Sequence, residues 1–202
     1  IKAVNDHKDN LLHMAVLYGS QSVLKELLKH KAINIEEKNK EDKTPAMLCA
    51  EVGCVKKLQL LKDAGATLSS ELVNIAASKG SMTFVKYCVE KLGLSLEYVD
   101  KKKRTVLHHA CTQANVEMVK YVLENAKGVK ELLLAKDYVG RTAVHLSCDN
   151  LIRQLDILEE VLDAGKKEGI LADLINERDH FTGSSTCVLV SGKDKGTEIT
   201  VT

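Results

Sequence analysis

Residues 105–114 read TVLHHACTQA, a threonine followed by an apolar run that contains two histidines and a cysteine. The same order of small, apolar and polar positions recurs at four other places in the chain. These copies are NLLHMAVLYG (10–19), TPAMLCAEVG (44–53), ELVNIAASKG (71–80) and TAVHLSCDNL (142–151). Copies that begin 27 to 37 residues apart indicate an internal repeat, which has to be recognised before any single motif is interpreted.

An amphipathic block follows each copy. Its apolar residues recur at the spacing of one helix face, as Val119, Val122 and Leu123 do after the fourth copy. The chain has one proline, no tryptophan and 3% aromatic residues, a composition typical of helices packed through Leu, Val, Ile and Ala. Each unit is therefore predicted to be a short helix, a tight turn and a longer helix.

This pattern resembles the ankyrin repeat over nearly the whole chain. The family motif is D-x-x-G-x-T-P-L-H-x-A-A-x-x-G, followed by an outer helix that ends in L-L-x-x-G-A. The second unit matches it with KTPAMLCAEVG and LLKDAGA, the fourth with RTVLHHA, and the fifth with DYVGRTAVH and VLDAG. The resemblance implies an all-α solenoid of stacked helix-turn-helix units joined by β-hairpin finger loops, because no unit can bury its apolar face alone.

We expect a single domain over residues 1–202. Its units are approximately 5–38, 39–67, 68–99, 100–136, 137–175 and 176–202, the last degenerate or truncated. The tail from residue 183 could instead form a β-hairpin, because CVLVS and TEITVT are rich in β-branched residues around GKDKG. We favour the sixth repeat.

The departures from the family motif predict local irregularities. The finger glycine is present only as Gly140, and Lys8, Asp42 and Lys103 replace it elsewhere, so those fingers should be less regular. The third unit has lost most of its finger, and Ser69 or Ser70 should cap its first helix. Residues 128–136 should be additional outer-helix or loop residues, and the fifth unit gains about two residues near 150–154.

Three histidines, His13, His108 and His145, occupy the histidine position of the family motif. The resemblance implies a structural role in which each imidazole bonds backbone in the fingers and ties the units together. A half-buried ring also needs partners for both nitrogens. The threonines before the helices, Thr44, Thr105 and Thr142, are predicted to cap them. The additional His109 should face the groove or a neighbouring helix.

The remaining chemistry is sparse. The six cysteines contain no CxxC pair and are interpreted as reduced thiols that pack as small hydrophobes, so we expect no zinc site, other metal or cofactor. No nucleotide-binding or hydrolase motif is present, and we expect no enzymatic activity. A net charge of +1 argues against general binding to nucleic acid, and no apolar run reaches the roughly 18 residues of a membrane span.

A partner is expected to bind the concave face made by the fingers and first helices. The family pattern places the exposed positions at the ends of the first helices at Leu17, Tyr18, Glu51, Val52, Ser78, Lys79, Thr112, Gln113, Asp149 and Asn150. On the fingers the corresponding positions are Lys40, Glu41, Lys43, Lys101, Lys102, Arg104, Tyr138, Val139 and Arg141.

Two features of this surface have alternative interpretations. Tyr18 and Tyr138 suit a binding hot spot in a chain so poor in aromatics, but Tyr18 could equally pack on the next unit. The run DKKKRT (100–105) could dock an acidic peptide, a phosphate or an anionic lipid surface, but basic runs in loops are more often merely solvated.

The leading hypothesis is a non-enzymatic scaffold or adaptor that binds a partner protein, with the oligomeric state left open. The alternative is a regulatory or targeting segment of a larger enzyme, kinase or channel, because the chain starts at Ile1 without methionine and the last repeat is incomplete. Reduced cysteines and the lack of a signal peptide favour an intracellular protein of the cytoplasm or nucleus.

Overall fold

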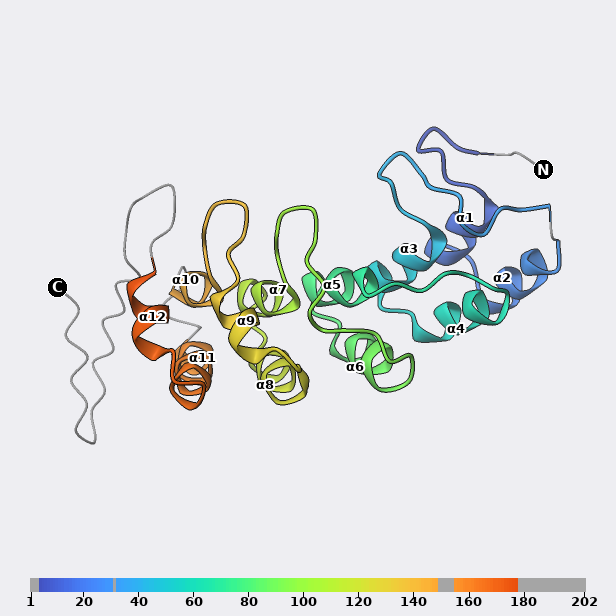
Figure 1. Cartoon of the computed structure of the whole chain (residues 1–202). Helices are drawn as coiled ribbons and strands as arrows, with labels where there is room; N and C mark the ends of the chain where they lie inside the picture. The colour runs from blue at the N-terminus through green and yellow to red at the C-terminus, as the bar shows by residue number, and fades with distance from the viewer. Residues whose placement is uncertain (1–3, 31, 149–154, 178–202) are drawn as a thin grey trace. The chain divides into compact units, whose positions relative to one another are not determined.

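A computed structural model describes residues 4–30, 32–148 and 155–177 (Figure 1). Within these ranges the secondary structure is entirely helical. The chain divides into two compact units, residues 1–98 and 99–202, which we call unit 1 and unit 2 and describe separately. Residues 149–154 and the tail from 178, including the predicted insertion and the sixth repeat or hairpin, lie outside the described residues.

Unit 1 contains three pairs of helices. The first helices of the pairs pack in a row, α1 against α3 and α3 against α5, and the second helices pack below them. The apolar stripes of both rows meet in a core of fully buried side chains that includes Val16, Leu58 and Phe84. The pairs are α1 (Leu11–Leu17) with α2 (Gln21–Leu28), α3 (Pro45–Val52) with α4 (Val55–Asp63), and α5 (Glu71–Ser78) with α6 (Met82–Glu90).

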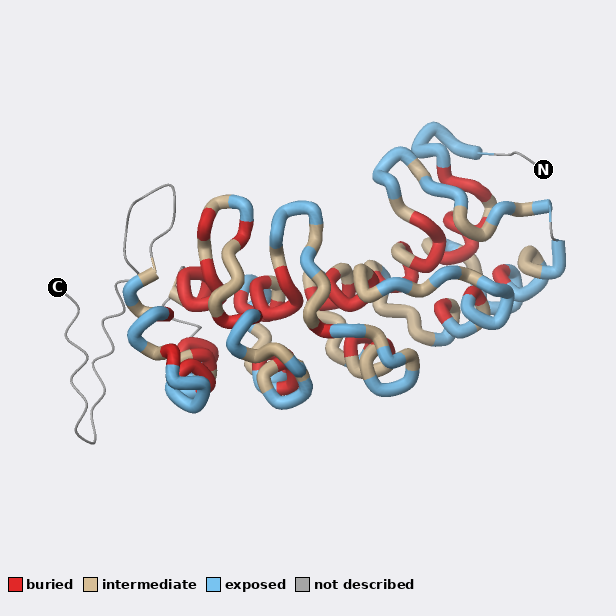
Figure 2. Tube along the Cα trace, in the orientation of Figure 1, coloured by how far each residue is buried: buried red, intermediate tan, exposed pale blue. Residues whose placement is uncertain are grey.

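Unit 2 repeats this arrangement with α7 (Val106–Thr112) and α8 (Val116–Asn125), then α10 (Ala143–Cys148) and α11 (Leu155–Lys167). The first helices α7 and α10 pack together, as do α8 and α11. The finger loops before α7 and α10 rise side by side above these helices in Figure 1, and their tips are exposed in Figure 2. The predicted helix-turn-helix repeat is confirmed.

Two short helices extend this plan. Residues 128–136 do not lengthen α8, because Ala126 takes an extended conformation that ends it; they form a separate helix, α9 (Val129–Leu134). A comparable helix that we did not predict, α12 (Leu171–Asn176), follows α11, and both short helices pack against α11. The outer helix of the fifth repeat, α11, continues through Gly165, the glycine of the VLDAG match, to Lys167.

The fingers are more regular than the sequence suggested. Gly140 has φ 88°, and the residues in its place have almost the same left-handed backbone, with φ 57° at Lys8, 62° at Asp42 and 55° at Lys103. Each of these residues donates its backbone N–H to the carbonyl three residues earlier, at 2.9 to 3.0 Å. The fingers with Lys or Asp in place of glycine therefore keep the same backbone shape, and the difference is the strain of a side chain in the left-handed region.

Replacement of Lys103 by glycine should stabilise the protein. A side chain in the left-handed region costs about 1 kcal/mol, which glycine would relieve. Glycine also makes the unfolded chain more flexible, and the entropy lost on folding offsets part of that stabilisation. We expect Lys103→Gly to raise the free energy of unfolding by about 0.5 kcal/mol and Asp42→Gly to raise it less, since aspartate tolerates this conformation better. Urea denaturation measures both; a loss of stability in Lys103→Gly would contradict the assignment of strain.

The predicted serine cap of the third unit is wrong. Ser70 precedes α5, but its backbone is already helical and its side chain makes no capping bond. Tight turns start the helix instead, with Leu72 N–H donating to the Ser69 carbonyl at 3.1 Å. The Ser70 hydroxyl accepts a hydrogen bond from the backbone of Ser95 at 2.9 Å.

Candidate functional site

Each finger is built around one asparagine or aspartate side chain. The Oδ1 atom accepts hydrogen bonds from the backbone N–H groups two and four residues later, at 2.8 to 3.1 Å. These bonds hold the chain in a closed loop and offset the cost of the left-handed residue within it. The residues are Asn5, Asn39, Asp100 and Asp137, which the sequence reasoning missed although they occupy the first position of the family motif.

Neighbouring fingers are joined through their backbones. In unit 1 the Lys40 N–H donates to the His7 carbonyl at 2.9 Å. In unit 2 the Tyr138 N–H donates to the Lys102 carbonyl at 3.0 Å. Each unit therefore presents a pair of fingers whose tips are fixed relative to one another, and none of the described finger residues belongs to a β-strand.

The motif histidines link a helix start to the next finger. His13 Nδ1 accepts from the backbone N–H of Asn10 at 3.1 Å, and its Nε2 donates to the Lys43 carbonyl at 2.9 Å. His108 makes the same two bonds, with the Thr105 N–H at 3.2 Å and the Arg141 carbonyl at 3.0 Å. His145 Nδ1 accepts from the Thr142 N–H at 3.2 Å.

The polar residues at the starts of the first helices differ in the hydrogen bonds that their side chains make. Thr44 accepts from the Met47 N–H at 3.3 Å, with Pro45 in the first turn of α3. Thr105 and Thr142 direct their hydroxyls to the histidine three residues later, at 2.8 and 2.9 Å. Asn74 occupies the histidine position of the third repeat and donates from its amide to the Tyr98 carbonyl at 3.1 Å, a substitution that the alignment contained and our reasoning missed.

His108 should make the stability of unit 2 depend on pH. Burial lowers the pKa of His108 below its ordinary value of 6.5, and the Arg141 carbonyl and the Asp137 carboxylate oppose this only in part. Below pH 6.5 the unfolded chain binds a proton that the folded chain does not, so the free energy of unfolding falls as the pH is lowered, by at most about 1.4 kcal/mol per pH unit. Denaturation of wild type and His108→Gln between pH 7.5 and 5.5 checks this: the variant should lose less stability.

Several predicted binding residues of unit 1 are paired with one another. The Lys43 ammonium lies 2.5 Å from Glu41 and 2.7 Å from Glu51, and Glu51 lies 3.1 Å from Lys79. Lys43 is on a finger, Glu51 on α3 and Lys79 at the end of α5, so this chain of charges crosses the surface formed by fingers and first helices. The apolar side chains of Tyr18 and Val52 remain exposed at the ends of α1 and α3.

In unit 2 the charges converge on Asp137, whose side chain is fully buried. Its Oδ2 atom lies 3.1 Å from Arg141 Nη2 and 3.7 Å from Arg104 Nε, while Oδ1 takes the two backbone bonds of the finger. Burial alone would raise the pKa of Asp137, but the backbone hydrogen bonds and the Arg141 guanidinium outweigh it and hold the pKa below its usual range. Arg104 and Arg141 thus help to hold the fingers as well as border the surface.

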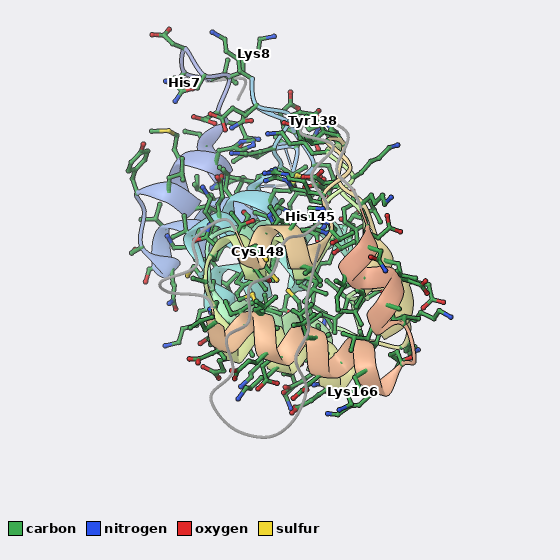
Figure 3. The ribbon with its side chains drawn as sticks, turned by 90° about the vertical axis from the view of Figure 1, so that its left-hand side faces the viewer. His7, Lys8, Tyr138, His145, Cys148 and Lys166 are labelled. Carbon is green, nitrogen blue, oxygen red and sulfur yellow. The ribbon has the colours of Figure 1, made fainter. Side chains whose placement is uncertain are left out.

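The finger tips of unit 2 are part of the exposed surface. Lys101, Lys102 and Tyr138 are exposed, Tyr138 at 61%, and Figure 3 shows Tyr138 at one end of unit 2 and Lys166 of α11 at the other, with His145 between them. His109 is half-buried, and its Nε2 lies 3.1 Å from Asp100 of its own finger.

The other predicted positions are distributed as follows. Lys40, Glu41, Thr112 and Gln113 are exposed, Leu17, Ser78 and Val139 are half-buried, and Asp149 and Asn150 lie outside the described residues.

Three of the five free cysteines in the described ranges are buried, and the possible metal ligands there do not cluster. No three His, Cys, Asp or Glu side chains there are arranged to hold a metal ion. Cys49, Cys88 and Cys111 are buried free thiols, and burial raises the pKa of each to about 12, which keeps them protonated. None of the described helices is both long and apolar enough to cross a membrane.

The paired helices, the fingers built on Asn or Asp, and the histidine links define an ankyrin repeat protein. A sequence profile of ankyrin repeats (three copies) matches residues 1–71 and 73–170, and the chain belongs to this family. The resemblance in sequence is thereby confirmed.

Among individual proteins, the chain is 27% identical over 162 residues to mouse NF-kappa-B inhibitor zeta, a match that covers 76% of this chain and 22% of that protein. It is 24% identical over 180 residues to an ankyrin repeat protein of Acanthamoeba polyphaga mimivirus, with 83% of this chain and 23% of that protein covered. The chain therefore spans less than a quarter of the length of these relatives.

Solved ankyrin repeat domains share the fold. The domain of Bcl-3, a member of the IkappaB family, superposes with a TM-score of 0.65 at 20% identity, and that of human ASB11 with 0.70 at 19%. Each superposition covers 92% of this chain and 79% of the other.

Proposed function

We propose that this chain is a non-enzymatic interaction module that holds a segment of a partner protein against its fingers and the ends of its first helices. Ankyrin repeats are a protein–protein interaction module, and the relatives above carry the same repeats. The observation that supports the location is the exposure of Tyr18 and Tyr138, 79% and 61%, on an otherwise aromatic-poor protein. Large side chains that stay exposed on rigid supports are typical of binding hot spots.

The kind of partner follows from the same comparison. The mouse relative is named as an inhibitor of NF-kappa-B, another protein, which favours a polypeptide partner for this chain. An ankyrin segment can act alone or direct a larger protein to its target, and capture of a partner is the step common to both roles. Cytoplasmic or nuclear action is part of the proposal, in keeping with the free cysteines of the described residues.

The test is capture of partners from a cell extract with the wild type and with Tyr18→Ala and Tyr138→Ala, followed by quantitative mass spectrometry. A hot-spot residue is worth about 2 kcal/mol, so each variant should bind a true partner roughly 30-fold more weakly. Lys166→Ala, at the far end of unit 2, is the control and should bind as the wild type does. Capture that neither tyrosine variant reduces would show that this surface is not the site.

Arg141→Ala is not a clean probe of binding. Its guanidinium bonds the buried Asp137 carboxylate, so the substitution would disturb the finger itself. The tyrosine side chains are mostly exposed, and their removal should leave stability within about 0.5 kcal/mol of the wild type.

A further inference from the structure

The finger pairs of the two units differ in charge. In unit 1, residues 5–9 and 39–43 contain three lysines and four acidic residues. In unit 2, residues 100–104 and 137–141 contain five basic and two acidic residues. The fold of the fingers is the same in both units, so their shape does not require this difference.

The two carboxylates of the unit 2 fingers bond groups within the fingers and the start of the unit. Asp137 is fully buried against two arginines, and Asp100 directs its carboxylate to the N–H groups of Lys102 and Arg104 and to His109. Both carboxylates are thus turned into the finger framework. Lys101, Lys102 and Lys103 are all exposed at the tip.

The fingers of unit 1 carry ion pairs at their surface. Lys43 bonds Glu41 and Glu51, and Lys38 lies 3.0 Å from Asp42 at the finger tip. The tip positions that are Lys102 and Lys103 in unit 2 are Glu41 and Asp42 in unit 1. An anionic ligand would therefore be favoured by unit 2 and opposed by the equivalent surface of unit 1.

Tyr138 adds an apolar contact to the cationic tip. Its backbone N–H is bonded to the Lys102 carbonyl, so the tyrosine is fixed next to the lysine-bearing finger, and 61% of the residue is exposed. A tyrosine has two side-chain torsions and loses little conformational entropy when it binds. The tip combines a point of apolar contact with positive charge beside it.

We propose that the finger pair of unit 2 binds an acidic polypeptide segment in which glutamate or aspartate side chains flank an apolar residue. This proposal rests on the interaction function above and names the partner's chemistry.

A lipid surface usually requires a cluster of about four to eight Lys or Arg side chains. Here Arg104 and Arg141 are engaged by Asp137, and the exposed tip offers Lys102 and Lys103. Single-stranded nucleic acid would favour several aromatic platforms for successive bases, and these fingers carry one tyrosine.

The experiment measures binding of a fluorescein-labelled 15-residue peptide, with glutamates on both sides of a central leucine and phenylalanine, to the whole chain by fluorescence anisotropy. The variant is Lys102→Glu with Lys103→Asp, which gives the fourth finger the acidic pair of the second. Its control is Lys166→Glu with Lys167→Glu, an equal change in net charge at exposed positions on α11, at the end of the same unit away from Tyr138. Circular dichroism checks that all three proteins are folded.

We expect the finger variant to bind the peptide at least about tenfold more weakly and the control to change affinity less than about twofold, because the interaction is local and screened beyond about 8 Å at physiological salt. A peptide with glutamine in place of glutamate should also bind at least about tenfold more weakly to the wild type. Equal binding by wild type and finger variant would overturn the proposal, as would equal losses in variant and control.

Two further probes separate this inference from competing ligands and from the proposed function. Tighter binding to phosphatidylserine vesicles or to a 15-nucleotide single-stranded DNA than to the acidic peptide would overturn it. Loss of cellular partners in Tyr138→Ala together with no binding of the acidic peptide would reject the acidic partner while the interaction module stands. If Tyr138→Ala keeps all cellular partners and the acidic peptide does not bind, both the acidic partner and the interaction function at this surface are rejected.

Discussion

Asp137→Ala is expected to be among the most damaging substitutions of a polar residue in unit 2, lowering its free energy of unfolding by about 3 kcal/mol. The change removes the acceptor of two finger N–H groups and leaves Arg104 and Arg141 without their buried counter-charge. We take the lower end of the range for broken buried ion pairs because both guanidinium groups keep partial contact with water. Urea denaturation followed by circular dichroism gives the value.

Asp137→Asn is the matched control, because asparagine holds the same position in both fingers of unit 1. It keeps an oxygen for the backbone bonds and loses only the charge, so we expect a loss of about 1 kcal/mol. At pH 7 the free energy of unfolding should be highest for the wild type, lower for Asp137→Asn and lowest for Asp137→Ala. A stability of Asp137→Ala within about 0.5 kcal/mol of the wild type would show that the carboxylate does not hold the finger pair.

His108→Ala should cost nearly as much, about 3 kcal/mol. The substitution opens a cavity around a fully buried ring and leaves the Thr105 N–H and the Arg141 carbonyl without the partners they have in the wild type. These two groups belong to the start of α7 and to the next finger, so the loss should loosen the contact between successive repeats.

Two variants separate the link from simple packing. His108→Gln places an amide N–H close to the position of Nε2 and should recover about half of the lost stability. His109→Ala removes a less buried ring with a single bond to Asp100 and should cost about 1 kcal/mol. If His109→Ala proves as damaging as His108→Ala, the motif histidine has no special role in joining the repeats.

Much of this architecture could be predicted from the sequence because the same motif recurs in each repeat. The recurrence of small residues and histidine in one register predicted the helix pairs, and Pro45 after Thr44 predicted the start of α3. The assignment of His13 and His108 to backbone contacts in the fingers came from the family resemblance, and the need of a buried imidazole for partners at both nitrogens agreed with it.

What the sequence did not predict depends on contacts formed after folding. Lys8 and Lys103 adopt a backbone that lysine disfavours, because the Asn5 and Asp100 side chains close the loop around them. Propensity at one position was overridden by a hydrogen bond from another, which a residue-by-residue interpretation does not weigh. Asn74 was missed for a related reason. Only the position of the Tyr98 carbonyl shows that the shorter amide can make a backbone contact like that of the motif histidine.

The charge of the proposed binding surface was predicted only in outline. The sequence identified the basic run at 100–104, but it did not show that Asp100 and Asp137 would turn inward. In unit 1 it marked Lys43, Glu51 and Lys79 as separate binding positions, whereas the structure joins them in ion pairs. Side-chain pairing across repeats depends on distances that no spacing along the chain supplies.

Site-specific photo-crosslinking tests most directly whether partners are held at the finger ends of the repeats. A benzophenone amino acid is placed at position 138 and, in separate proteins, at position 18 and at position 166 of α11, and each protein is irradiated in cell extract. The account predicts that polypeptides are crosslinked from positions 18 or 138 and that position 166 yields none of them. Crosslinks obtained from position 166 alone would contradict it.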